Sequence, residues 1–507
     1  MSRRVIILLS GVTATSLVLA TAGVQAQTRA TGLRTGTPAY VAQEVPAASS
    51  PSGFPGTPSG VADPAAVIQD QNSVVSRKAP PRASRPVQAR GLRGVTQRQF
   101  RAPQRIVTGL PPAPEPPPPR RRKTAVEEDP YAPLGLRLGN ITLRPGFTNS
   151  IGYDTNPERV SGSARNSSPF ARYEGDLAIQ SDWNTNELKG SLRAGYSDYF
   201  RDRNASRPDG EGKLDLRLDA TRDTRILLES RFNLDTQRPG SPDLTASVTG
   251  RPLVYQYGAS AGVTHDMNRL QLTLRGSVDR SDYEDAKLTS GTTLSQKDRN
   301  QTQYGVRLRA AYELTPGFKP FIQGEIDTRQ FDQAVDSSGY QRSSNGLTGR
   351  VGSTFELSRL VTGEVSAGYQ DRAYDDDRLK NLRGFVGDAA ILWSPTPLTT
   401  VTLRGTSELG DTTIAGSSGT TARRVSLEIA HALRRNLTLT GFAKFGRTEY
   451  DGQGLREDLS SIGARVEYKL TRTFSVRASF THERLNSTTR GSDYTANVAQ
   501  VGLRVQF

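Results

Sequence analysis

The sequence predicts an all-β fold, a closed up-and-down antiparallel transmembrane β-barrel of about 18 strands, with 16 as the alternative, behind a disordered N-terminal tail. Long segments alternate apolar and polar residues with period two, which is typical of strands between two unlike environments. The connections are alternately short and long, as an outer-membrane barrel requires. Only 35% of the 507 residues are hydrophobic, and no internal run reaches the roughly 18 apolar residues of a transmembrane helix.

Residues 1–26 are predicted to be a secretory signal peptide. They contain "RR" at positions 3–4, an apolar segment over 5–19 and the cleavage-site sequence "VQA" at 24–26. A retained anchor helix is the alternative. Export implies an oxidising compartment, yet the chain has no cysteine. This absence excludes thiolate metal sites and thiol catalysis, and we expect no cofactor and no metal.

Residues 27–130 form a second region, rich in Pro, Ala, Ser, Gly, Gln and Arg, that includes the stretch "PPAPEPPPPRRRK". Such a composition cannot bury enough apolar area to offset chain entropy, so a disordered periplasmic tail is predicted. The tail is either a plain spacer or a tether that reaches peptidoglycan, a periplasmic protein or anionic lipid head groups. Most of the +15 net charge lies in residues 1–130, and no nucleic-acid partner is predicted.

Residues 131–507 are predicted to form the outer-membrane barrel. Eight short turns such as "WNTN" and "TRDT" alternate with nine long loops of modest length, and these connections join 18 strands. Each repeat carries two long strands, whereas a propeller blade needs four short ones. The strands that run toward the long loops are predicted to end near Tyr199, Asp235, Tyr283, Phe331, Tyr374, Leu409, Tyr450 and Leu485.

Alternation along these strands separates an apolar set from a charged set. An arginine facing lipid at the bilayer midplane would cost about 2–4 kcal/mol, so the charged set is predicted to face inward. That set holds more Arg and Lys than acids. We predict the following lumen-lining residues, acting as a field and not as individual ligands: Arg217, Arg275, Arg307, Arg309, Arg350, Arg404, Arg465 and Arg504.

An 18-stranded barrel can leave an aqueous channel. Guanidinium groups on its wall would lower the barrier for anionic groups such as uronates or phosphates. Alternatively, Arg/Glu pairs neutralise one another as ladders along the wall and carry no information about cargo. The sequence leaves both interpretations open.

The chain ends in "VAQVGLRVQF", which alternates apolar and polar residues up to Phe507. Because an open strand edge leaves unpaired backbone groups in the bilayer, this last strand is predicted to pair with the first. Phe507 is predicted to be a lipid-facing terminal aromatic. The partners that follow are outer-membrane lipid and, through the C-terminal strand, the barrel-assembly machinery.

Several segments resemble the putative β-barrel porin 2 family of outer-membrane proteins: "SIGYDTNP", "LSRLVTGEVSAGYQDRAYDDDR", "LRRNLTLTGFAKFGRTEYDG" and the final phenylalanine. The resemblance covers roughly residues 135–507 and lies in repeated short motifs, not in a catalytic signature. It implies a location in the Gram-negative outer membrane and a link to exopolysaccharide export. The Pro/Arg-rich tail lies outside the pattern, and no functional residue is carried over.

The predicted function is therefore a porin-like conduit, for anionic solutes or for export of an exopolysaccharide, with an anionic polysaccharide as a partner. The alternative is a non-conducting structural or adhesin barrel with a plugged lumen. Long lumen-filling loops would favour the alternative. An enzyme is not expected, because His482 beside Glu483 is the sole candidate for acid–base chemistry, and adjacent strand residues point to opposite faces.

Overall fold

The computed structural model describes residues 130–507, apart from 163–165, 245–247 and 359. The predicted signal peptide (1–26) and all but the last residue of the predicted tail (27–130) lie outside the described residues. Those two assignments stay predictions.

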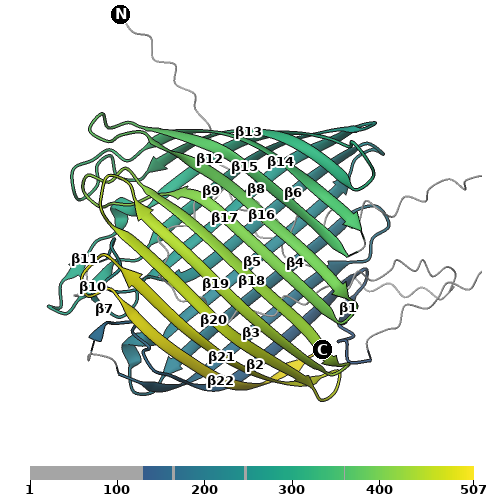
Figure 1. Cartoon of the computed structure of the whole chain (residues 1–507), viewed down its shortest axis with the longest axis horizontal. Coiled ribbons are helices and arrows are strands. Elements are labelled where there is room, and N and C mark those ends of the chain that lie inside the picture. Colours follow the sequence, from purple (N-terminus) through teal and green to yellow (C-terminus); the bar gives the residue numbers. More distant parts are fainter. Residues whose placement is uncertain (1–129, 163–165, 245–247, 359) are drawn as a thin grey trace, which may run out of the picture. The chain divides into compact units, whose positions relative to one another are not determined.

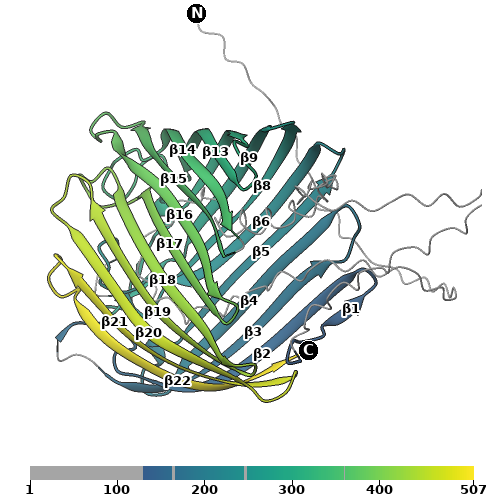
Figure 2. The same ribbon diagram turned by 45° about the vertical axis from the view of Figure 1, so that its right-hand side comes forward.

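Eighteen antiparallel strands form one closed barrel, whose strands run obliquely across its wall (Figures 1 and 2). In order they are β2 (Ile141–Asp154), β3 (Ser168–Ser181), β4 (Glu187–Tyr199), β5 (Arg207–Asp219), β6 (Thr224–Thr236), β8 (Leu253–Met267), β9 (Leu270–Tyr283), β12 (Gln301–Tyr312), β13 (Phe318–Phe331), β14 (Ser344–Ser358), β15 (Val361–Tyr374), β16 (Leu382–Thr396), β17 (Thr399–Gly410), β18 (Thr420–Arg434), β19 (Leu437–Tyr450), β20 (Arg456–Lys469), β21 (Phe474–Ser487) and β22 (Tyr494–Gln506).

Small elements complete the described chain. They are β1 (Leu136–Leu138), which pairs with the start of β2, a three-stranded sheet of β7 (Val248–Thr249), β10 (Ala286–Leu288) and β11 (Thr293–Leu294), and the 3₁₀ turns η2 (Arg203–Ala205) and η3 (Lys297–Arg299). In the described part of the chain, no helix has the length and apolar character needed to cross a bilayer.

The barrel closes between its first and last strands. β2 pairs with β22 from Gly146 opposite Gln506 to Asp154 opposite Val498. Each of the eighteen barrel strands therefore has two hydrogen-bonded neighbours, and no edge of the barrel sheet is left open, as a bilayer requires. The prediction of a closed antiparallel barrel with 18 strands is confirmed.

The connections also follow the predicted alternation. Eight short turns meet at one end and nine longer loops at the other, which is the left-hand end in Figure 1. Five of the eight predicted strand ends coincide with the observed ones. The other three, at Asp235, Leu409 and Leu485, fall one or two residues short.

Alternation along each strand gives the wall two unlike faces. On β12, Tyr304, Val306 and Leu308 are 47%, 48% and 54% exposed and project outward. The inward face is mainly polar and charged, and in the described part of the chain the buried apolar residues form only small clusters. One such cluster joins Leu382, Val386 and Leu409 near the long-loop end.

Candidate functional site: the charged inner wall and the loop-crossed mouth

The eight predicted arginines project from the concave face of the wall. On β12, Arg307 and Arg309 alternate with the exposed outward residues Val306 and Leu308. Strand register then carries this face around the barrel, since Arg307 lies opposite both Arg275 and Glu325. By the same register the set comprises Arg217 on β5, Arg275 on β9, Arg307 and Arg309 on β12, Arg350 on β14, Arg404 on β17, Arg465 on β20 and Arg504 on β22.

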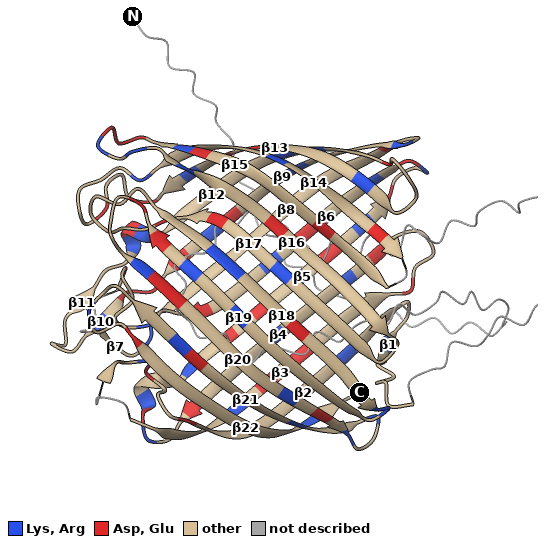
Figure 3. Cartoon of the chain, viewed as in Figure 1, with Lys and Arg blue, Asp and Glu red and all other residues tan. Residues whose placement is uncertain are grey.

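Most of these arginines form ion pairs with carboxylates. The pairs are Arg217–Glu187 at 3.0 Å, Arg275–Glu229 at 3.1 Å, Arg307–Glu325 and Arg309–Glu364 at 2.8 Å each, Arg350–Asp388, and Arg504–Asp176. The guanidinium of Arg465 instead lies 5.7 Å from the ring centre of Phe442. Lysines, arginines and acids are interspersed along the strands (Figure 3). The wall is therefore largely a ladder of compensated charges.

Several inward carboxylates were missing from the set that the sequence predicted. Four of them form ion pairs with arginines on the concave face: Asp176, Asp209, Asp279 and Asp388. Strand parity could have found them, since Asp209 shares the parity of Arg217 on β5. The expected excess of inward cations came from this incomplete set.

Many of these pairs reach over a whole strand. Arg172 on β3 contacts Asp209 on β5 at 2.7 Å and passes over Gly195 of β4, where a Cβ would come within 2.6 Å of the guanidinium. Arg372 on β15 likewise reaches Asp327 on β13 across Gly346 of β14. Such side chains converge only on the concave face, and the intervening glycine leaves room for them.

The same arrangement closes the seam of the barrel. Arg504 on β22 donates to Asp176 on β3 at 2.6 Å and lies over Gly146 of β2. A Cβ on Gly146 would also come within 2.8 Å of the Asp176 carboxylate. The ion pair between Arg504 and Asp176, called here the clasp, thus bridges the seam between β2 and β22 on its inner side.

The connection from β6 to β8, called here the cross-mouth loop, crosses the long-loop end, and its described residues are 237–244 and 248–252. Asp243 accepts hydrogen bonds from the Thr412 hydroxyl at 2.6 Å and the Thr413 amide at 3.1 Å. These partners precede β18. Counting from β2, β6 is the fifth barrel strand and β18 the fourteenth, so the contact joins walls about half a circumference apart.

A second anchor ties the cross-mouth loop to another part of the wall. Arg238, 1% exposed, pairs with Glu457 of β20 at 3.0 Å. Ser492, in the loop before β22, donates its hydroxyl to the Gly240 carbonyl at 2.8 Å. Leu244 and Val248 pack with Ala286 of the neighbouring long loop in a small apolar cluster. The loop therefore crosses the mouth with fixed contacts.

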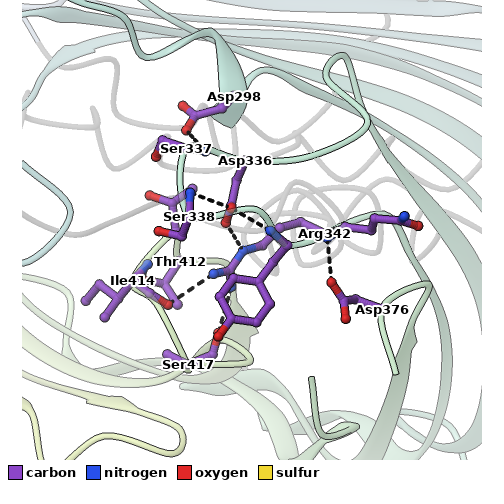
Figure 4. A network of polar contacts seen from close by, with 12 residues as sticks. Asp298, Asp336, Ser337, Ser338, Arg342, Asp376, Thr412, Ile414 and Ser417 are labelled. Carbon is purple, nitrogen blue, oxygen red and sulfur yellow. Dashed lines mark hydrogen bonds and ion pairs between the residues drawn. The ribbon is translucent and has the colours of Figure 1, made fainter. Parts of the chain in front are cut away.

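Arg342 organises a further network of loops at this end (Figure 4). Its Nε donates to Asp336 at 2.7 Å, while Nη1 and Nη2 donate to the carbonyls of Ser417 and Ile414 at 2.6 and 3.0 Å. The Gln341 amide donates to Asp376 at 2.9 Å. Three loops, those before β14, β16 and β18, are thereby joined.

Loop charges beside β2 are also buried. Arg159 pairs with Asp154 at 2.8 Å and lies 3.5 Å from Glu483. Burial disfavours the guanidinium charge of Arg159, but Glu483 and Asp154 outweigh it, so its pKa lies above the usual range. Burial and the neighbouring charge of Asp202 raise the pKa of Glu158. The buried charge of Arg159 is thus paired, whereas Glu158 lies beside a second acid.

His482 and Glu483, the candidates for acid–base chemistry, point to opposite faces of the wall. The His482 ring contacts the Asn497 amide oxygen at 2.8 Å and is exposed on the outer side. Glu483 is 2% exposed and faces inward, where it contacts Arg159 and Tyr494. The two side chains do not form a catalytic pair. Phe507, 56% exposed, lies just beyond β22, and its amide donates to the Pro145 carbonyl at 3.2 Å.

Comparison with solved structures finds barrels of low similarity. OccAB4 from Acinetobacter baumannii is 10% identical, with 73% of this chain and 99% of that chain covered at a TM-score of 0.37. The copper transporter OprC is 9% identical, with coverage of 74% and 84% and a TM-score of 0.39. OpdQ from Pseudomonas aeruginosa is 10% identical, with coverage of 72% and 98% and a TM-score of 0.37.

No curated protein matches the chain in sequence. A family comparison does match, over residues 129–507, to the family described as Putative beta-barrel porin 2. This match spans the whole described barrel, from before β1 to the final phenylalanine. Its extent agrees with the closed 18-stranded barrel and its polar interior. The chain therefore belongs to the Putative beta-barrel porin 2 family and is an outer-membrane β-barrel of the porin-like kind.

Proposed function

We propose that this chain is a porin-like conduit for hydrophilic solutes, with anionic solutes or an exported anionic polysaccharide as its cargo. The observation that carries the proposal is the inner wall of paired guanidinium and carboxylate groups. Charged side chains on such a wall must be either hydrated or closely paired, because burying an unpaired charge in apolar surroundings costs much free energy. The eight arginines named above are proposed to line the water-filled lumen.

Pairing changes the selectivity that this conduit should have. Arg307 and Glu325 neutralise each other, as do Arg309 and Glu364, so the field that favours anions is weak. Paired guanidinium and carboxylate groups still offer many donors and acceptors to a hydroxyl-rich chain. We propose weak anion preference together with weak, repeated contacts to a saccharide.

The cross-mouth loop supports the view that the passage is restricted at the long-loop end. Its contacts reach Glu457 on β20 and Thr412 in the loop before β18. A narrow entrance admits small solutes or a single extended chain. A folded macromolecule would not pass.

The test is single-channel recording of the full chain, refolded in a planar bilayer under a salt gradient. The proposal expects stepwise conductance with a reversal potential displaced slightly toward that of the anion. Added anionic oligosaccharide should interrupt the current in brief events. A cation-selective pore, or current that oligosaccharide never perturbs, would contradict the proposed cargo.

A non-conducting structural or adhesin barrel is the second candidate, because the cross-mouth loop and the Arg342 network interlock at the mouth. Silence in the same recordings, from protein shown by circular dichroism to be folded β, would favour it. The tail of residues 27–130 is proposed to lie in the periplasm, as a spacer or a tether to peptidoglycan or a periplasmic protein.

Delivery to the membrane is proposed to depend on recognition of the C-terminal strand by the barrel-assembly machinery. Phe507 is proposed to contact outer-membrane lipid there. Its exposed ring at the end of β22 supports both assignments.

A further inference from the structure

Four arginines gather on the outer face of the barrel wall, near the long-loop ends of four consecutive strands. They are called here the outer arginine patch: Arg423 on β18, Arg447 on β19, Arg456 on β20 and Arg484 on β21. Arg423, Arg447 and Arg456 are 54%, 37% and 49% exposed, and Arg484 is exposed as well. By strand parity they point away from the lumen.

The patch carries an unusual cross-strand pair. Arg423 and Arg447 lie directly opposite each other in the pairing of β18 with β19. Like charges in that position destabilise a sheet unless an anion lies between them. This juxtaposition requires compensating negative charge beside the two arginines, and how much of it the barrel itself supplies decides whether an external anion is needed.

Internal acids compensate the patch only in part. Glu449 pairs with Arg423 at 3.0 Å, and Asp458 is shared between Arg447 at 2.6 Å and Arg456 at 3.2 Å. Arg484 donates its Nε to the neutral amide oxygen of Asn486 at 3.1 Å. Four guanidinium groups thus face two carboxylates.

The position of the patch gives a further indication of an external anion. Farther along the same outer faces, Val425 lies two residues from Arg423 on β18, and Phe445 lies two residues from Arg447 on β19. Ile462 lies six residues from Arg456 on β20, and the three apolar residues are 52%, 50% and 62% exposed. The arginines therefore lie at the edge of the outward apolar band. In a bilayer this edge is where hydrocarbon gives way to lipid head groups.

Other charged groups on the outer face are balanced by acids. Arg280 on β9 contacts both Asp282 and Asp332 at 2.6 Å. Arg383 on β16 pairs with Asp371 on β15 at 2.9 Å. Neither group has a surplus of positive charge with which to hold an anion. The outer arginine patch differs from both because its net charge is positive.

We propose that the outer arginine patch binds the head group of a glycolipid that carries two phosphates, in the leaflet at the long-loop end. Guanidinium forms bidentate hydrogen bonds with phosphate oxygens, which suits it better than lysine to this role. Three strand spacings separate β18 from β21, a span of roughly 15 Å along the wall. That span accommodates two phosphates on one disaccharide, while the acyl chains lie against Phe445 and Ile462.

The test compares binding of diphosphorylated lipid A by the full chain, in phosphatidylcholine vesicles, with binding by the double variant Arg423→Ala/Arg447→Ala. Loss of two charge-assisted contacts is expected to weaken binding at least tenfold, because hydrogen bonds between ionised groups are stronger than those between neutral groups. Arg280→Ala is the matched control and should bind within about twofold of the wild type. Gel mobility without heating verifies that each variant is folded.

Three further arms identify the anion. Arg423→Lys/Arg447→Lys should retain part of the affinity, because charge survives while the bidentate geometry is lost. Lipid A without its phosphates should not compete. Competition by millimolar inorganic phosphate would assign a free-phosphate site and overturn the lipid assignment. Unchanged binding by the double alanine variant, or equal loss in Arg280→Ala, would also overturn it.

Discussion

At the residue scale, the direction of each side chain follows from its parity along a strand. Ile322 on β13 is 63% exposed, while its neighbour Gln323 faces inward opposite Arg350. Sequence alternation alone predicted these two faces. It did not predict how far the inward arginines extend, because reaching over a strand requires a glycine on the strand between.

We expect Ile322→Arg to lower the free energy of unfolding in lipid vesicles by about 2–4 kcal/mol, because the guanidinium would lie in hydrocarbon. Gln323→Arg on the opposite face is the control and should cost much less. Urea titration monitored by tryptophan fluorescence measures both. Equal costs for the two variants would show that the assigned faces are wrong.

A second prediction concerns the glycines over which arginine side chains reach to a carboxylate two strands away. Gly346→Val would place side-chain atoms where the Arg372 guanidinium passes, with the Cβ only 2.7 Å from its Nη2. We expect a loss of about 1–3 kcal/mol from overpacking and a disturbed Arg372–Asp327 pair. Gly349→Val on the same strand meets no atom within 4 Å of its Cβ and should be nearly neutral in the same urea titration.

Phe507 allows a third prediction at this scale. Phe507→Ala should reduce the amount of folded barrel in the outer membrane several-fold, while barrel refolded in vitro keeps most of its stability, because one terminal ring adds little burial. Quantitative blotting of heat-modifiable protein in membrane fractions measures the first effect. Normal membrane levels would remove the proposed role of the terminal aromatic in assembly.

At the scale of elements, the long loops act as structured parts. Leu244, Val248 and Ala286 give two of them a shared apolar cluster, and a three-stranded sheet joins them. The modest loop lengths favour a conduit over a plugged barrel, yet Asp243 and Arg238 reach parts of the barrel far from β6. Local sequence carries no signal for such contacts, since each depends on closure of the barrel.

Release of the cross-mouth loop is expected to widen the passage. Arg238→Ala/Asp243→Ala removes its contacts to β20 and to the loop before β18, so single-channel conductance should rise or fluctuate between levels. Arg383→Ala, on the outer face of β16, is the control and should leave conductance unchanged. An identical conductance in the double variant would show that the loop does not restrict flow.

At the scale of the whole molecule, the architecture was predictable because closure, strand length and turn length are repeated along the chain. Period-two alternation specified both faces, and short turns such as that at Asn268, whose φ is +57°, specified the reversals. The charge balance of the interior was less predictable. Asp176 and Arg504 are separated by 328 positions, and only the closed ring brings them together.

The clasp over Gly146 has a consequence for biogenesis. Arg504 lies on β22, the last strand of the barrel, so its bond to Asp176 cannot exist until that strand has been made and exported. A chain cut short by premature termination loses the backbone seam and the clasp together, and its first strand keeps an open edge. The barrel can therefore close only when its last strand is present. Truncated copies should stay unclosed and accessible to periplasmic proteases, and should not accumulate as defective pores.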